Sequence, residues 1–159
     1  MNEQLSKNFS LDELTNTTHR ELLVQNRLEA ETTRSVQMNL HILANELLQP
    51  IRDYYKRPLR VLSGFRCDAL NSAVGGSKAS QHCLGEACDF IIPGVDLEDI
   101  FKWVKKESGL KYGQLILECY DKTLRTGWIH ISSPRITGKN QEALTASRVG
   151  NKFHYDKVV

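Results

Sequence analysis

Residues 80–92 read Ser80-Gln81-His82-Cys83-Leu84-Gly85-Glu86-Ala87-Cys88-Asp89-Phe90-Ile91-Ile92. His82 and Asp89 are seven residues apart with Gly85 between them, so a tight turn can bring both side chains to one point. The mostly apolar segment 87–92 ends at Pro93-Gly94, which is typical of a buried strand. A turn that delivers an imidazole and a carboxylate together has the geometry of a metal site.

A third ligand can come from a predicted hairpin further along the chain. Residues 113–120 and 127–132 are two apolar runs with alternating side chains, separated by a polar loop. If even-numbered positions of the two strands pair with each other, Glu118 and His130 project from the same face, opposite the core. Zinc in catalytic sites commonly has three protein ligands and one water, so His130 can complete the set. The other histidines are expected to be surface or hydrogen-bonded side chains: His19, His41 and His154.

The remaining pattern predicts helices early in the chain and strands later. A capping box begins a short helix at Ser10, and apolar positions three or four apart predict a long helix over 35–56, kinked at Pro50. A strand at 59–63, a helix at 68–74 and a helix from Asp96 to Gly109 follow. We therefore expect an α+β fold, a small antiparallel sheet with helices packed on one side. Residues 1–159 form one domain, with a helical lead-in at 1–34 and a covering tail at 139–159, where periodicity is weak.

Composition and charge exclude several classes of protein. The 159 residues are 40% hydrophobic and 25% charged, as in globular domains and unlike disordered or fibrous chains. The net charge of +2 is too small to indicate nucleic acid as a partner. We also expect the protein to be a monomer. No apolar run is long enough to cross a membrane and no secretory signal is present, so we expect synthesis in the cytosol. The four cysteines are interpreted as buried thiols, with a cysteine-rich zinc site as the alternative.

Four groups of short motifs, taken in order, resemble one known family. They are Ser63-Gly64-Phe65-Arg66, then Leu70-Asn71 with Val74-Gly75-Gly76, then Ser80-Gln81-His82-x-x-Gly85-x-Ala87-x-Asp89, and last Trp128-Ile129-His130-Ile131-Ser132. Over about residues 9–133 they look like the zinc D-alanyl-D-alanine carboxypeptidase superfamily. That superfamily includes phage endolysins and the D,D-dipeptidases of vancomycin resistance. The resemblance implies the fold that it shares with the Hedgehog signalling domain.

The resemblance also implies a set of site residues. His82, Asp89 and His130 would hold a zinc ion whose water attacks a peptide bond. Arg66 matches the family arginine that binds a substrate carbonyl or carboxylate, a role suited to a planar guanidinium, and an arginine that braces a loop is the alternative. Trp128 is interpreted as a packing residue. The implied substrate-binding residues are Arg66, Ser80 and Gln81.

The general base departs from the family pattern. Many members carry it as Glu-x-x-His, three residues before the last ligand, and that position here is Gly127. We expect Glu118 to replace it, because the hairpin pairing places it on the face of His130 and because some members have Gln-Leu-Ile-x-Glu at this point. The alternative is that Glu118 orients a ligand histidine without moving a proton. Asp121 and Glu86 are weaker candidates.

The implied function is hydrolysis of peptide-stem amide bonds in bacterial peptidoglycan by a zinc metallopeptidase, either a D,D-carboxypeptidase or an endopeptidase. A phage or prophage origin is expected, because release through a holin would bring a cytosolic protein without a signal peptide to the cell wall. Two alternatives stay open: a noncatalytic, zinc-stabilised module that binds cell wall, and a virion-associated phage structural protein. Gly127 is the feature that supports the first alternative.

Overall fold

The computed structural model describes residues 2–135, 138 and 140–159. The α-helices are α1 (Leu11–Thr15), α2 (Leu23–Thr32), α3 (Arg34–Leu43), α4 (Gln49–Tyr55), α5 (Asp68–Ala73) and α6 (Leu97–Lys106). Shorter turns are the 3-10 helices η1 (Arg20–Leu22) and η3 (Gln81–Leu84) and the π-helix η2 (Ala44–Leu48). The strands are β1 (Arg60–Ser63), β2 (Ala87–Ile91), β3 (Gln114–Asp121), β4 (Thr126–Ser132), β5 (Glu142–Val149) and β6 (Lys152–Lys157).

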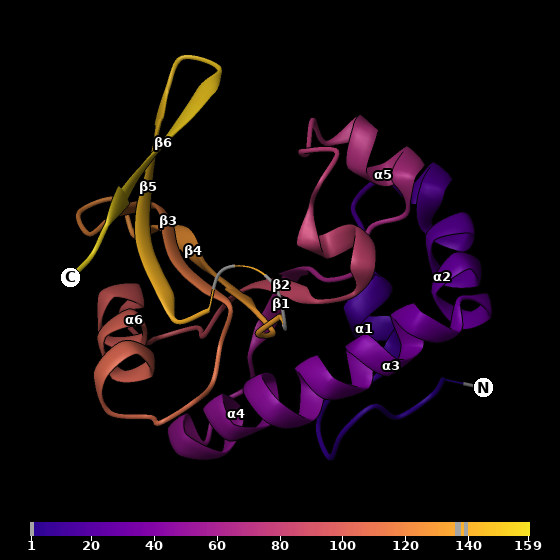
Figure 1. The fold of residues 1–159 in the computed structure, drawn as a ribbon, viewed down its shortest axis with the longest axis horizontal. Helices are drawn as coiled ribbons and strands as arrows, with labels where there is room; N and C mark the ends of the chain where they lie inside the picture. Colours follow the sequence, from indigo (N-terminus) through magenta and orange to yellow (C-terminus); the bar gives the residue numbers. More distant parts are fainter. Residues whose placement is uncertain (1, 136–137, 139) are drawn as a thin grey trace.

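The described strands form one sheet in the order β1-β2-β4-β3-β5-β6 (Figure 1). The α+β class predicted from the sequence is confirmed, and so is the antiparallel hairpin of β3 and β4. One pair, β3 with β5, is parallel, so the sheet is mixed where we expected antiparallel pairing. The reason is the connection after β4, which carries the chain to the far side of β3 before β5 begins.

The two faces of the sheet have different neighbours. One face packs on α3, α4 and α6 and contains the main hydrophobic core (Figure 1). Its fully buried side chains include Phe90 from β2 and Leu47 from the long helix. Because side chains alternate along a strand, Asp89, Glu118 and His130 project from the opposite face. The polar residues of interest are therefore separated from the core by the sheet itself.

The long helix predicted over residues 35–56 consists of α3, η2 and α4 in succession. Pro50 lies in the first turn of α4 and cannot donate a backbone hydrogen bond. The π-helical turn comes directly before it, and the Gln49 N–H is bonded to the Ala44 carbonyl. Insertions of this kind are a common cause of helix distortion. The helix therefore distorts at Pro50 and continues past it.

Two regions lack a sequence signal but are regular in the structure. Of its ten residues α2 buries Asn26 and Ala30, so no apolar stripe marks it as a helix. The tail, described from residue 140 onward, forms β5 and β6 and extends the sheet. β6 is exposed at all six positions, so it lacks the alternation of a half-buried strand. Backbone pairing with β5 holds it in place.

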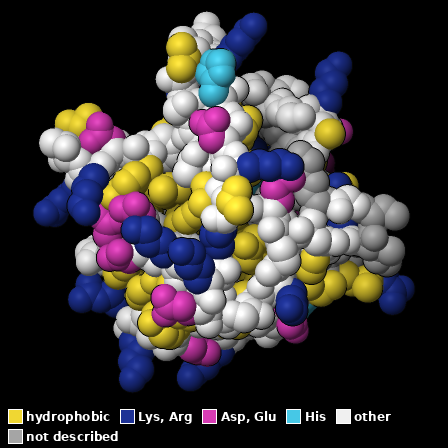
Figure 2. Space-filling model, turned by 60° about the vertical axis from the view of Figure 1, so that its left-hand side comes forward, with side chains coloured by type: hydrophobic (Ala, Val, Ile, Leu, Met, Phe, Trp, Pro, Cys, Tyr) yellow, Lys and Arg dark blue, Asp and Glu magenta, His cyan; other side chains and the backbone are white. Residues whose placement is uncertain are grey.

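The surface of the molecule mixes charges of both signs. On the face drawn in Figure 2, basic and acidic side chains are interspersed among apolar and neutral ones. The net charge of +2 is thus not gathered into one patch on this face. Among the described residues, no helix has the length and apolar character that a membrane crossing requires.

A buried asparagine joins the N-terminal helices to the loop after β1. The Asn26 side chain donates hydrogen bonds to the carbonyls of Thr15 (2.8 Å) and Phe65 (3.0 Å). Its oxygen accepts a hydrogen bond from the Cys67 backbone N–H at 2.7 Å. Asn26 is fully buried, so loss of these bonds would leave backbone groups without partners. Arg66 lies between the two bonded loop residues and is positioned by them.

We expect Asn26→Ala to lower the free energy of unfolding by about 2 kcal/mol or more, because buried polar groups would lose their partners. Urea unfolding followed by circular dichroism measures the change. Asn39→Ala is the matched control, since Asn39 makes one exposed hydrogen bond, to the Leu84 carbonyl. Equal losses in the two variants would show that the buried asparagine has no special role in stability.

Candidate metal centre and active site

Two strands and one turn bring the candidate ligands together. Asp89 on β2 pairs with His130 on β4, and its neighbour on the other side is Ser63 on β1. His82 comes from η3, directly before β2. Gly85 then adopts a left-handed conformation, with φ 72°, which turns the chain into β2. The tight turn predicted between His82 and Asp89 is present.

The three side chains meet at one point. Asp89 Oδ1 lies 2.8 Å from His130 Nδ1 and 3.3 Å from His82 Nε2. One ligand atom from each of the three residues lies within 4.8 Å of the other two. Both imidazoles are buried. This cluster has the compactness that a single metal ion requires.

The second nitrogen of each imidazole is also held. His82 Nδ1 lies 2.8 Å from the Gly64 carbonyl, which can only accept, so Nδ1 carries the proton and Nε2 is left for a ligand. His130 Nε2 lies 3.1 Å from Gln81 Oε1, which turns Nδ1 toward Asp89. Such hydrogen bonds fix the tautomer and orientation of metal-binding histidines. Two imidazole nitrogens and one carboxylate oxygen fit zinc with an open fourth position.

Asp89 supplies the negative charge of this centre. Burial opposes its ionisation, but the imidazoles of His82 and His130 outweigh burial and hold the pKa of the carboxyl well below its usual range. A buried carboxylate is stable only with partners of this kind. The centre is therefore built around an anion, which favours a bound cation.

Glu118 on β3 faces the same side of the sheet. It pairs with Trp128, two residues before His130, so the predicted pairing of even with even positions is confirmed. Burial raises the pKa of Glu118 to about 7; the charge of Asp89 adds to this effect, while His130 and Arg66 oppose it. The nearby Trp128 indole N–H also favours the charged form of Glu118.

Gly127 cannot hold the side chain that the family pattern places there. Its φ is 105°, in the region that favours glycine. A Cβ atom at this position would lie 2.6 Å from the Glu118 carbonyl oxygen. The backbone therefore excludes a glutamate at residue 127. A carboxylate on this face has to come from a neighbouring strand, as Glu118 does.

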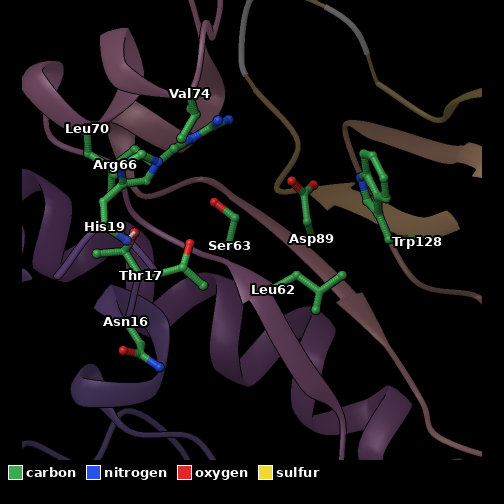
Figure 3. Close-up of a pocket in the computed structure, with 11 residues that line it drawn as sticks. Asn16, Thr17, His19, Leu62, Ser63, Arg66, Leu70, Val74, Asp89 and Trp128 are labelled. Carbon is green, nitrogen blue, oxygen red and sulfur yellow. Dashed lines mark hydrogen bonds between the residues drawn. The ribbon is translucent and has the colours of Figure 1, made fainter. Parts of the chain in front are cut away.

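A cleft of about 300 Å³ opens beside the centre (Figure 3). The sheet contributes Leu62, Ser63, Asp89 and Trp128, and the other side is formed by residues 16–19, Arg66, Leu70 and Val74. Arg66 Nη2 lies 3.4 Å from the Ser80 hydroxyl. Arg66 Nε is buried without a hydrogen-bond partner among the described residues. Because the Arg66 side chain lines the cleft, its guanidinium could bind a carbonyl or carboxylate there.

Ser80 and Gln81 contact other site residues in the structure. The Ser80 hydroxyl accepts a hydrogen bond from the His82 backbone N–H at 3.3 Å, in addition to its contact with Arg66. Gln81 contacts His130 as described above. Both residues therefore support the orientation of the site, and their binding of substrate stays a prediction.

Two parts of the cleft were not expected from the sequence. Trp128, interpreted as a packing residue, lines the cleft opposite residues 16–19 (Figure 3). His19, expected to be a surface or hydrogen-bonded side chain, lies 3.2 Å from Glu21 as such a residue would, and it also belongs to that segment of the cleft. No motif marks this segment, because it reaches the cleft only through the packing of α1 and α2. The even-numbered register that identified Glu118 could also have identified Trp128.

Two cysteines adjoin the ligands in the sequence, Cys83 and Cys88. Neither belongs to the metal-binding cluster found among the described residues. Burial raises the pKa of both thiols, and the thiolate is the form that binds metal. The cysteine-rich zinc site considered above therefore has no support.

Protein purified without chelator and supplied with zinc should contain about one zinc ion per chain, measured by mass spectrometry of the metal. His82→Ala, Asp89→Ala and His130→Ala should each reduce that content, because each removes one of three ligands. His154→Ala, on the exposed strand β6, is the control and should keep the metal. Circular dichroism checks folding, and full occupancy in all three ligand variants would contradict the site.

The raised pKa of Glu118 predicts a pH dependence of stability in the metal-free protein. Ionisation of Glu118 is disfavoured by folding, so its contribution is fully present below about pH 4.5 and is lost as the pH rises through about 7. In EDTA, the melting temperature of Glu118→Gln relative to wild type should therefore rise between pH 5 and pH 8. The exposed variant Glu31→Gln should show no such trend. A constant difference for Glu118→Gln would contradict the raised pKa.

Comparison with known proteins agrees with this geometry. The family model described as Peptidase M15 matches residues 7–132, which include the three candidate ligands, Arg66 and Glu118. A comparison with curated proteins found no match. The resemblance noted in the sequence is thus confirmed at the level of the family. Since the match covers most of the chain, the protein belongs to the M15 peptidase family, which consists of zinc-dependent peptidases.

Proposed function

We propose that this protein hydrolyses amide bonds in the peptide stems of bacterial peptidoglycan, with zinc held by His82, Asp89 and His130 and with Glu118 as the general base. The observation that carries the proposal is the position of Glu118. It lies on the same sheet face as the metal cluster, one strand from His130, and pairs with Trp128, which lines the cleft. A metal site and a carboxylate of raised pKa are what hydrolysis of a peptide bond needs.

The proposed chemistry divides between the metal and the chain. Zinc, when bound, supplies a Lewis acid that activates water and polarises the scissile carbonyl. Glu118 accepts a proton from the attacking water and returns it to the leaving amine. Its pKa of about 7 in the metal-free protein lies near neutral pH, where an acid–base group works best. Arg66, which lines the cleft, binds a carbonyl or the terminal carboxylate of the substrate through its guanidinium.

The proposal covers both D,D-carboxypeptidase and endopeptidase cleavage, because a zinc site with a general base serves either reaction. Its extension to a phage or prophage endolysin, released to the wall by a holin, is supported by the resemblance to phage endolysins. Mass spectrometry of muropeptides digested by the protein identifies the bond that is cut.

Glu118→Gln keeps the size of the side chain but cannot accept a proton. We expect zinc content to stay unchanged while muropeptide cleavage falls by about 10² to 10⁴-fold, the usual contribution of a general acid–base group. Glu142→Gln, on the next strand, is the control for a change of charge on this face. Retention of activity within twofold would exclude Glu118 as the base.

The noncatalytic wall-binding module is the second candidate, and Gly127 is the observation that favours it. It predicts that wild-type protein binds zinc and cell wall but cleaves no muropeptide. In that case Glu118 would be a carboxylate that orients the ligands. The same digestion therefore distinguishes the two functions.

A further inference from the structure

The hairpin of β5 and β6 lies beyond the family match, which ends at residue 132. In Figure 1 this hairpin and α5 stand on either side of the strands that carry the metal ligands. The hairpin is paired to β3, the strand of Glu118, through residues 142–146 of β5. It is thus an addition to the matched region that borders the candidate active site.

One row of side chains crosses four strands at this point. Trp128 pairs with Glu118, Glu118 with Ala146, and Ala146 with Tyr155. Paired residues project from the same face of a sheet, so Tyr155 shares the face of Glu118. Only the small side chain of Ala146 lies between them in this row. Partial burial raises the pKa of the Tyr155 phenol, and the charges of Glu118 and Asp89 contribute, which agrees with this proximity.

Tyr155 belongs to an exposed aromatic patch, which we call the hairpin patch and define as Tyr155, Phe153 and Arg148. Tyr155 is 53% exposed and Phe153 is 40% exposed. Their ring centres are 6.2 Å apart with an angle of 28° between the planes. The Arg148 guanidinium lies 6.0 Å from the centre of the Phe153 ring. Exposed aromatic rings beside a guanidinium suit a ligand that combines apolar parts with a carboxylate.

The distances suit a peptide that extends from the metal centre. Tyr155 is two strands from Glu118, which corresponds to about 10 Å at the usual strand spacing. An extended peptide covers that distance with about three residues. A peptide with its scissile bond beside Glu118 would therefore reach the hairpin patch with its third or fourth residue.

Charge and position decide which end of the peptide lies there. Arg66 is on the other side of the centre, toward α5, and suits the C-terminal carboxylate. The N-terminal part then runs toward the hairpin. In a peptidoglycan stem, the residue three positions before a terminal D-Ala-D-Ala bond is a γ-linked D-glutamate, whose free carboxylate complements Arg148.

We propose that the hairpin patch binds the N-terminal, carboxylate-bearing part of the peptide stem and makes the protein prefer long stems over short peptides. This inference rests on the proposed function, because it places the scissile bond at the metal centre. The hairpin then acts as a specificity element carried on the scaffold of the family.

The test measures binding of two peptides to zinc-loaded Glu118→Gln protein by calorimetry. The long probe is L-Ala-γ-D-Glu-L-Lys-D-Ala-D-Ala, and the short probe is acetyl-L-Lys-D-Ala-D-Ala, which lacks the two N-terminal residues. Tyr155→Ala, Phe153→Ala and Arg148→Gln should each weaken binding of the long probe at least fivefold and leave the short probe within twofold. His154→Ala is the matched control, since it lies on β6 between the two aromatic residues and points to the opposite face.

Each outcome decides the inference. Equal effects on both probes, no effect on either, or no binding of the long probe by zinc-loaded protein would overturn it. Losses seen only with muropeptides that carry sugar would also overturn it and would assign the patch to the glycan. If Glu118→Gln still cleaves the probes, the proposed base is wrong, and the ratio of kcat/KM values for the two probes makes the same comparison.

Discussion

The partly buried negative charge of Asp89 is the constraint on which the rest of the site depends. A carboxylate in this position is tolerated because two imidazoles face it, and each imidazole is fixed through its other nitrogen by a separate part of the chain. The pairing of β2 with β4 sets Asp89 opposite His130. A slip of one residue in that pairing would turn Asp89 into the hydrophobic core, so the register of the sheet and the metal site are maintained together.

The two faces of the sheet have different roles, one in stability and the other in the proposed chemistry. The helices α3, α4 and α6 bury one face of the sheet, while the other face carries ionisable groups and the cleft. Positioning of the cleft wall depends on a polar contact rather than on the apolar core. Asn26 ties the N-terminal helices to the loop of Arg66. Residues 16–19, which form the cleft wall, lie in the chain between Thr15 and Asn26, and these two residues are hydrogen-bonded to each other.

Local patterns predicted the parts of this protein that depend on neighbouring residues. The spacing of His82 and Asp89 around Gly85 indicated the turn, and the alternation in two apolar runs indicated the face shared by Glu118 and His130. The strands of the tail escaped prediction because an exposed edge strand held by backbone bonds has no alternating pattern. The cleft wall at residues 16–19 escaped because the residues on either side of it, Leu14 and Asn26, are held by hydrogen bonds to residues 65–67, far along the chain.

The protonation and burial of the cysteine thiols affect how the protein responds to oxidising conditions around the candidate metal centre. Burial raises the pKa of Cys83, Cys88 and Cys119, and the fourth, Cys67, is 2% exposed. Oxidants attack the thiolate, so a raised thiol pKa slows the reaction. Cys67 and Cys88 are also buried, as expected from the sequence, whereas Cys83 and Cys119 are only partly buried. The ligands themselves are nitrogen and oxygen atoms, which thiol oxidation leaves unchanged. The same centre can therefore be kept intact in a reducing cell interior and in the oxidising surroundings outside it.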